Sequence, residues 1–337
     1  MPRKAMLWEK LGKKRVHCRL CAHRCKINEG DFGICGMREN VGGELRTFAY
    51  GKVIARHVDP IEKKPFYHFL PGSYAFSIAT IGCNFRCSFC QNWTISQASA
   101  RAEVIEGEDM TPEAIVDAAI KSKCKSVSYT YTEPTIFFEY AYDTSRIARK
   151  KGLRNNFVTN GFMTKEAIDK IAPYLDAANI DLKFFNDKSY GRLCMGRLQP
   201  VIDSIRYMKK KGIWVEVTTL IVTGENDSEE EVRDIAKFLA GVDKDMPWHI
   251  SRFHPDYKYL ESEPTAIDVL KKAYEIGREE GLKYVYLGNV PAENDTICPG
   301  CGGVFVKRSV FEAEPAENFQ ESGKCKKCGA GIAGVWK

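Results

Sequence analysis

The sequence has no apolar run of 18 residues, no low-complexity tract and no convincing internal repeat. The missing apolar run argues against a membrane-spanning helix, and the opening residues MPRKAMLWEKLGKKR lack the apolar core of a secretory signal. Its 13 cysteines in 337 residues are too few for a disulfide scaffold, and a chain this long can bury a core without cross-links. We therefore expect a globular protein of about two domains in a reducing, cytoplasmic compartment.

Excess positive charge is absent outside the first 60 residues. The net charge is +6, and residues 1–60 contain 13 basic and 6 acidic side chains. A basic segment can attract an acidic protein partner or nucleic acid. This segment lacks interleaved aromatic side chains, so a solvated surface is the simpler interpretation and nucleic-acid binding is not expected.

Short β-rich runs alternate with helical patterns from about residue 74. Thr111, Thr164 and Ser228 each precede a helical pattern as an N-cap would. Repeated alternation of strand and helix predicts a parallel sheet with right-handed crossovers. The expected strands cover residues 74–81, 126–131, 154–159, 177–182, 214–222, 248–253 and 283–287.

Candidate functional residues follow successive expected strands. They are a cysteine-rich loop, then Glu133, Asn160, Asp181 with Lys183, and His254. The carboxyl ends of the strands of a barrel converge on one mouth, whereas an open sheet would spread these residues along its edge. We expect an α/β fold with a partial or complete parallel (β/α) barrel over residues 71–290, flanked by small cysteine-rich modules at residues 1–70 and 291–337.

Eleven of the cysteines form three tight groups, and two stand alone. The odd total and the spacings of two or three residues disfavour disulfides and favour a soft metal. The groups are Cys83, Cys87 and Cys90; Cys298, Cys301, Cys325 and Cys328; and Cys18, Cys21, Cys25 and Cys35, with Cys124 and Cys194 outside them.

The central group has the spacing C-x3-C-x2-C directly after a predicted strand. Three thiolates on one short loop can bind three irons of a cubane cluster and leave the fourth iron without a protein ligand. A zinc knuckle completed by a distant histidine, or three unrelated buried thiols, would be the simpler alternatives.

This loop resembles the signature of the radical SAM superfamily. The resemblance implies a [4Fe-4S] cluster on Cys83, Cys87 and Cys90 whose open iron binds S-adenosylmethionine (SAM). Electron transfer from the cluster would cleave SAM to methionine and a 5′-deoxyadenosyl radical, which abstracts hydrogen from carbon. Phe89, just before the last cysteine, would lie near the adenine.

The resemblance extends over roughly residues 74–290 and implies further SAM contacts. Tyr131-Thr132-Glu133-Pro134 stands where the family has Gly-Gly-Glu-Pro. An Asp-Leu-Lys at residues 181–183 resembles a site for a monovalent cation beside SAM, but the second aspartate of that site is replaced by Val158. The SAM-binding residues implied are Phe89, Thr132, Glu133, Thr159, Asn160, Asp181, Lys183 and His254.

Each of these residues also has a structural interpretation. The negative charge of Glu133 can stabilise the N-terminus of a helix. Asp181 and Lys183 can form a salt bridge, and His254 can be an ordinary structural histidine. Their ordered arrival at successive strand ends favours a shared site.

The C-terminal cysteines form two C-x2-C pairs separated by 23 residues. Cys298, Cys301, Cys325 and Cys328 therefore predict a closed structural zinc ribbon. A rubredoxin-like iron or a second cluster is the alternative.

The N-terminal cysteines are less diagnostic. Cys18, Cys21, Cys25 and Cys35 suit either zinc or an auxiliary iron–sulfur cluster, and the sequence leaves both open.

All three groups together resemble the radical SAM member of the AmmeMemoRadiSam system, related to pyruvate formate-lyase activating enzymes. The motifs do not dictate the substrate; our first hypothesis is a protein or peptide, with a reductant such as ferredoxin or flavodoxin. Two alternatives remain open: a radical SAM enzyme acting on a small molecule or lipid, and a metal-rich RNA- or protein-binding module.

Overall fold

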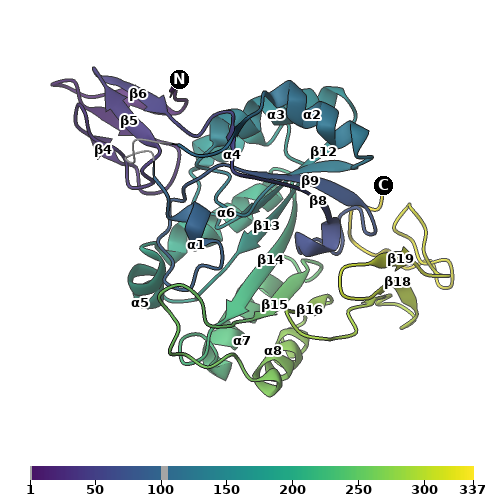
Figure 1. Ribbon diagram of the computed structural model, residues 1–337. Coiled ribbons are helices and arrows are strands. Elements are labelled where there is room, and N and C mark those ends of the chain that lie inside the picture. Colours follow the sequence, from purple (N-terminus) through teal and green to yellow (C-terminus); the bar gives the residue numbers. More distant parts are fainter. Residues whose placement is uncertain (1, 100–104) are drawn as a thin grey trace.

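An eight-stranded sheet forms the centre of the computed structural model, which describes residues 2–99 and 105–337 (Figure 1). Seven of the strands are parallel and lie in chain order, and the eighth pairs antiparallel with the first of them. Each expected strand is present to within a few residues. In spatial order the strands are β8 (Ala55–Pro60), β9 (Tyr74–Ala79), β11 (Ser126–Tyr129), β12 (Arg154–Thr159), β13 (Ala177–Asp181), β14 (Trp214–Ile221), β15 (Trp248–Arg252) and β16 (Val285–Gly288).

Helices connect the parallel strands. Thr111, Thr164 and Ser228 accept hydrogen bonds from backbone N–H groups of the helices that follow them, so these predicted N-caps are confirmed. The helices are α1 (Trp93–Ser96), α2 (Pro112–Lys121), α3 (Phe138–Lys150), α4 (Lys165–Ile171), α5 (Asp187–Ser189), α6 (Leu198–Lys210), α7 (Glu229–Val242) and α8 (Ile267–Glu279), with a 3-10 turn η1 (Ile61–Lys63) and a π-turn η2 (Tyr190–Cys194).

The sheet is a partial barrel, because its two edge strands, β8 and β16, do not pair with each other. The segment after β8 and the C-terminal module lie along this opening. Phe69 forms a parallel bridge with Val335, and the ring of Tyr67 lies 4.7 Å from that of Tyr286 on β16. No helix of the described residues is long and apolar enough to cross a bilayer.

The N-terminal module consists of short strands whose buried residues belong to the same hydrophobic core as the barrel. Figure 1 shows it on the side of the barrel opposite the C-terminal module. Its strands are β1 (Arg3–Lys4), β2 (Trp8–Lys10), β3 (Val16–Cys18), β4 (Lys26–Ile27), β5 (Arg38–Val41), β6 (Glu44–Thr47) and β7 (Lys52–Val53), the last paired with β10 (Glu108–Asp109).

The C-terminal module contains a three-stranded sheet and a small hydrophobic core of its own. That core includes Cys298, Cys325 and Trp336, and it reaches Tyr284 and Tyr286 of the barrel. The strands are β17 (Thr296–Ile297), β18 (Val304–Arg308) and β19 (Ala313–Pro315).

Candidate active site at the mouth of the barrel

A cavity of about 480 Å³ lies at the carboxyl ends of the parallel strands. It brings together most of the residues that the sequence placed after those strands. The residues from the predicted site that line it are Cys83, Cys87, Phe89, Cys90, Thr132, Glu133, Thr159, Asn160, Asp181 and Lys183. Only His254 of the predicted set is not among the lining residues.

The loop that carries the three cysteines is held from several sides. The loop begins at Gly82, whose φ of +96° is one that glycine adopts readily. A Cβ atom at this position would lie 2.5 Å from the side chain of Met37, so a larger residue would clash there. The backbone N–H groups of Arg86 and Ser88 donate to carbonyls of η2. The side chain of Arg86 donates to the carbonyl of Ile34 in the N-terminal module. The N-terminal module therefore helps to fix the cysteine loop.

The three thiols suit a group that stabilises thiolates. Burial raises the pKa of Cys83 and Cys90, and the neighbouring thiol of Cys194, followed by burial, raises that of Cys87. Two buried polar atoms of the same loop, Nδ2 of Asn84 and Oγ of Ser88, have no partner. Three thiols that line one cavity, on a loop with unpartnered buried donors, fit a bound group with acceptor atoms, as an iron–sulfur cluster has.

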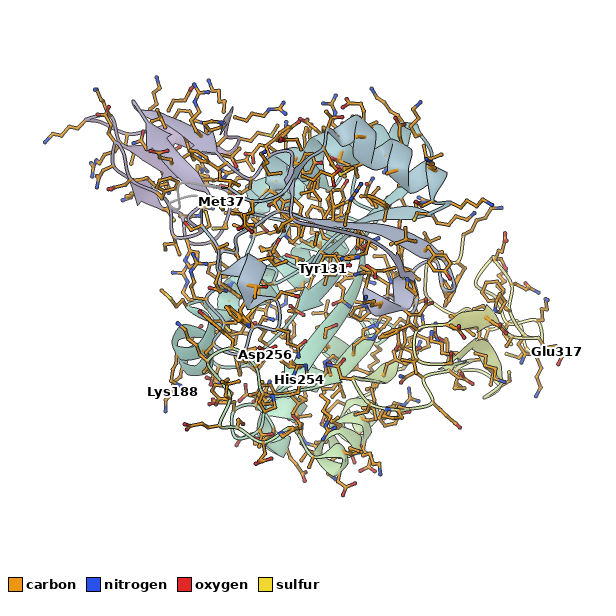
Figure 2. The ribbon with its side chains drawn as sticks, viewed as in Figure 1. Met37, Tyr131, Lys188, His254, Asp256 and Glu317 are labelled. Carbon is orange, nitrogen blue, oxygen red and sulfur yellow. The ribbon has the colours of Figure 1, made fainter. Side chains whose placement is uncertain are left out.

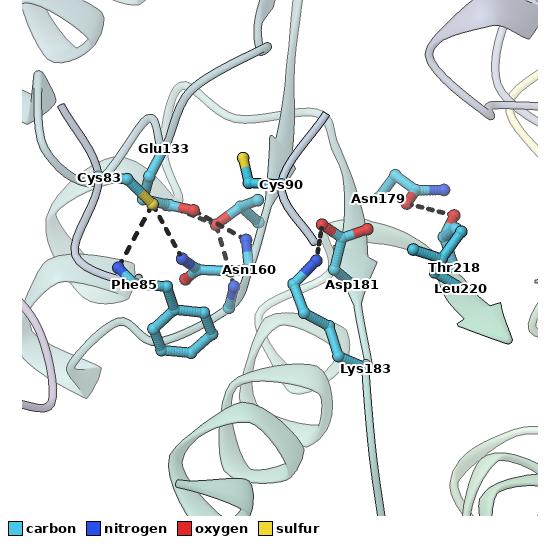
Figure 3. A network of polar contacts seen from close by, with 12 residues as sticks. Cys83, Phe85, Cys90, Glu133, Asn160, Asn179, Asp181, Lys183, Thr218 and Leu220 are labelled. Carbon is cyan, nitrogen blue, oxygen red and sulfur yellow. Dashed lines mark hydrogen bonds and ion pairs between the residues drawn. The ribbon is translucent and has the colours of Figure 1, made fainter. Parts of the chain in front are cut away.

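Glu133 is the centre of a buried hydrogen-bond network (Figure 3). Its Oε1 accepts from the backbone N–H of Thr135 at 3.0 Å, from the Thr135 hydroxyl at 2.5 Å and from the Thr159 hydroxyl at 2.7 Å. Its Oε2 accepts from the backbone N–H of Asn160 at 2.8 Å. Since a carboxylate oxygen can accept more than one hydrogen bond, Oε2 keeps acceptor capacity at the cavity wall. Burial raises the pKa of Glu133 in spite of these bonds.

Asn160 connects this network to the cysteine loop. Its Nδ2 donates to Oδ1 of Asn84 at 2.7 Å and lies 3.8 Å from Sγ of Cys83. Figure 3 shows Glu133, Asn160 and Cys83 facing one another. The ends of β11 and β12 are thereby fixed relative to the first cysteine.

Asp181 and Lys183 form an ion pair at the end of β13, with 2.9 Å between Oδ2 and Nζ (Figure 3). The salt-bridge interpretation is correct for this pair, and both side chains also line the cavity. A monovalent cation would meet a carboxylate already paired with an ammonium group and, at the position of the missing aspartate, the side chain of Val158. These residues do not fit such a cation.

His254 is exposed at the end of β15 (Figure 2). Its Nε2 lies 2.8 Å from the side-chain amide nitrogen of Gln91, which does line the cavity. His254 therefore stands at the rim, one side chain away from the cavity.

Sequence reasoning did not identify several lining residues. Lys63 and Lys64 come from the segment between β8 and β9, Asn289 directly follows β16, and Phe311 belongs to the C-terminal module. Two adjacent lysines in a sequence usually indicate a solvent-exposed surface. No sequence pattern predicts that Phe311 lies near the barrel. Tyr131 was noted only as a departure from a glycine, and it adopts the left-handed φ of +64° that glycine favours.

The four C-terminal thiols converge on one point. Within the described ranges, they are the group of three or more potential ligands whose ligand atoms all lie within 4.8 Å of one another. Sγ of Cys298 is 3.6 Å from that of Cys328, and Sγ of Cys301 is 3.8 Å from that of Cys325. Tetrahedral zinc with Zn–S bonds of about 2.3 Å requires sulfur atoms about 3.8 Å apart. The residues present therefore fit a single tetrahedral ion.

The four N-terminal thiols are arranged differently. Cys18, Cys21, Cys25 and Cys35 border one narrow cavity of about 10 Å³ beside Arg38, and they do not converge as the C-terminal thiols do. The cavity is small for a cubane and the thiols are not gathered as around a single ion, so the geometry does not decide between the two alternatives.

Comparison with known proteins agrees with this geometry. A family model described as the radical SAM superfamily matches residues 77–239, which contain the cysteine loop and the ends of β11, β12 and β13. An uncharacterised protein of Methanocaldococcus jannaschii is 46% identical over 333 residues, or 98% of each chain.

More distant relatives have more informative names. A second Methanocaldococcus jannaschii protein, named as a glycyl-radical enzyme activating enzyme, is 26% identical over 65% of this chain and 80% of its own. Among solved structures, Streptococcus suis SuiB bound to S-adenosylmethionine has a TM-score of 0.51 at 14% identity, covering 68% of this chain and 53% of that chain. This last similarity supports the fold.

Proposed function

The chain belongs to the radical SAM superfamily, and we propose that it abstracts hydrogen from carbon on a protein or peptide substrate. The observation that carries this proposal is that three thiols of one loop line the same cavity as Glu133 and its hydrogen-bond network. Cys83, Cys87 and Cys90 would hold a [4Fe-4S] cluster. When bound together, the cluster and SAM supply a 5′-deoxyadenosyl radical.

The chain's own residues position and shield this chemistry. Glu133 offers its remaining acceptor capacity to an amino group, and its four hydrogen bonds prevent it from turning away. Lys183 offers an ammonium group to a carboxylate. Phe89 is 3% exposed and packs edge-on against Phe184, so it provides an apolar wall that excludes water. His254 would act from the rim, through Gln91 or after a movement of its side chain.

The size of the cavity supports a substrate that reaches in from outside. A volume of about 480 Å³ is within the range that encloses one drug-sized ligand. SAM is a ligand of that size and would fill much of this volume. A protruding peptide group would need less room, and the name of one relative as an activating enzyme of glycyl-radical enzymes supports this choice. A reductant such as ferredoxin or flavodoxin would supply the electron.

The two outer cysteine groups complete the proposal. The C-terminal thiols would hold structural zinc, and the N-terminal thiols a second metal centre, either zinc or iron–sulfur. Thirteen free cysteines suit a reducing, cytoplasmic compartment.

SAM cleavage by the anaerobically reconstituted protein tests the assignment of the cysteine loop. We expect reductant-dependent formation of 5′-deoxyadenosine and methionine by the wild type and its loss in Cys87→Ala. Cys124→Ala is the matched control, because Cys124 is also buried but does not line the cavity. Cleavage that persists in Cys87→Ala would contradict the assignment, and a glycyl-radical EPR signal on an added partner protein would support the protein substrate.

A further inference from the structure

Two lysines line a part of the cavity that the proposed chemistry does not use. Lys63 ends η1 and Lys64 follows it, so both come from the segment that crosses from β8 to β9 along the opening of the barrel. The side chain of Lys63 is 47% exposed and that of Lys64 only 3%. Lysine side chains are rarely buried unless they are paired, so the burial of Lys64 calls for an explanation.

The Lys64 ammonium group is held by two neighbours. Its Nζ lies 2.7 Å from Oδ2 of Asp59 and 4.1 Å from the centroid of the Tyr131 ring. The Tyr131 hydroxyl donates to the same carboxylate, and Lys63 reaches its other oxygen at 2.9 Å. Asp59 therefore serves two ammonium groups and one hydroxyl, so the carboxylate balances only one of the two positive charges.

Tyr131 has a conformation that this arrangement explains. A tyrosine at φ +64° is strained where glycine would not be, and such strain persists where the surroundings hold it in place. The ring supports the Lys64 ammonium group as a cation–π partner, and the hydroxyl fixes Asp59. Glycine could do neither.

The remaining charged groups of the cavity are accounted for. Asp181 and Lys183 pair with each other, and the Glu133 carboxylate accepts hydrogen bonds from four neutral donors. Lys63 and Lys64 share the single carboxylate of Asp59, so these three side chains together keep a net charge of +1 at the cavity.

We propose that Lys64, assisted by Lys63, binds an anionic group of the substrate, a carboxylate or a phosphate, and so orients the carbon that loses its hydrogen. This inference rests on the proposed radical function and adds a substrate class to it. Phe311, which is 47% exposed and lines the same cavity, offers an apolar contact beside the anion. The substrate group is therefore expected to be an acidic side chain, a chain terminus or a phosphorylated residue.

Calorimetric titration of the full-length reconstituted protein, loaded with SAM, tests this site with inorganic phosphate and with acetate as probes. We expect Lys64→Met to weaken binding of the preferred anion about ten- to hundredfold, as for loss of a charged hydrogen bond. Lys63→Met should have a smaller effect. Lys211→Met is the matched control, because Lys211 pairs with Asp169 away from the cavity, and it should leave binding unchanged.

The two probes distinguish the sources of the anion. Tighter binding of phosphate supports a phosphorylated substrate, and tighter binding of acetate supports a carboxylate. If neither probe binds, or if Lys64→Met binds as the wild type does, the inference is wrong. A parallel loss of SAM affinity in Lys64→Met would assign the lysine to the SAM carboxylate and would likewise overturn it.

The variant Asp59→Asn/Lys64→Met controls for the possibility that Lys64→Met loses anion binding because it unfolds. It removes both buried charges together, so a double variant that unfolds as the wild type does but fails to bind the anion supports the site. Anion titration requires no turnover. A wild-type chain that binds the anion but does not cleave SAM would therefore contradict the proposed function and leave the anion site intact.

Discussion

The N-terminal module presents Arg38 to the barrel, and the C-terminal module presents Arg308. Both side chains are buried, at 1% and 7% exposure. Arg38 pairs directly with the carboxylate of Glu139 on α3, which is fully buried. Among the described residues the Arg308 guanidinium has no carboxylate partner, and it donates instead to carbonyls, to the Thr296 hydroxyl and towards the faces of two tyrosine rings.

The difference shows two ways of attaching a module that has little core of its own. The N-terminal module shares the barrel's hydrophobic core, and its charge is neutralised across the contact. The C-terminal module has a separate small core in which two cysteines take part, and its contact with the barrel combines the rings of Tyr67, Tyr284 and Tyr286 with a polar network. In that network His68 lies 2.6 Å from the carbonyl of Ala333 and 2.7 Å from the Tyr286 hydroxyl. We therefore expect the C-terminal module to depend on metal more than the N-terminal module does.

The largest predicted effect is removal of metal from the C-terminal thiols. Cys325→Ser should lose one zinc per chain and with it metal-binding free energy on the order of 10 kcal/mol, because the small core cannot persist alone. Amide hydrogen exchange should rise throughout β17, β18 and β19. Metal analysis by mass spectrometry and exchange measurements on the reconstituted protein check this.

The matched variant in the other module is Cys25→Ser. Exchange in β3 and β5 should rise far less, because these strands share the barrel's core. Equal loss of protection in both modules would contradict the comparison. Metal analysis of the wild type tests the N-terminal thiols as well. Four irons and one zinc per chain would be accounted for by the cysteine loop and the C-terminal thiols, so the N-terminal thiols would then hold no metal.

The next largest effect is expected at the paired arginine. Arg38→Met leaves the Glu139 carboxylate buried without its cation, which should lower the free energy of unfolding by about 3–5 kcal/mol. Arg308→Met leaves no buried carboxylate without its cation, so the free energy of unfolding should fall by only about 1–3 kcal/mol. Denaturant unfolding measures both, and a larger loss for Arg308→Met would reverse the proposed difference between the contacts.

A double variant tests the origin of the Arg38 effect. In Arg38→Met/Glu139→Gln no buried charge remains, so its loss of stability should be smaller than the sum of the single losses. Additive losses would show that packing, rather than charge, holds the N-terminal module.

The sequence predicted the barrel well because short β-rich runs alternate regularly with helices, several of which begin at a recognisable N-cap. The ends of β11, β12 and β13 followed from that order, and so did the meeting of Glu133, Asn160 and Asp181. The substrate wall was not predictable. Asp59 and Lys64 lie outside any motif, and Tyr131 stands where the motif has a glycine; the pairing of β8 with β9 and of β9 with β11 brings the three together.

The contact with the C-terminal module was unpredictable for a similar reason. Arg308 and Tyr67 are 241 residues apart, and neither belongs to a pattern with recognisable spacing. The cysteine spacing indicated the module's metal site, because its ligands are local pairs. It gave no information about what the module packs against.

The smallest predicted effect is a pH dependence on the C-terminal side of the barrel. Burial raises the pKa of Glu62 to about 7, and although its Oε1 accepts from the backbone N–H of Gly72, its Oε2 has no partner. The folded state therefore holds a proton that the unfolded chain releases near pH 4.5, and stability falls as pH rises from about 4.5 to 7. Glu62→Gln should raise the free energy of unfolding at pH 8 by up to about 3 kcal/mol and change it little at pH 4.

Thermal unfolding of both proteins at pH 4 and pH 8 measures this effect. Glu139→Gln on the N-terminal side is the opposite control, because Glu139 is paired with Arg38 and its neutralisation should destabilise the protein at pH 8. A stabilisation by Glu62→Gln that is equal at both pH values would assign the effect to packing. If ionised Glu139 stabilises its contact while ionised Glu62 weakens the opposite one, then pairing, and not burial alone, decides whether a buried carboxylate stabilises the fold.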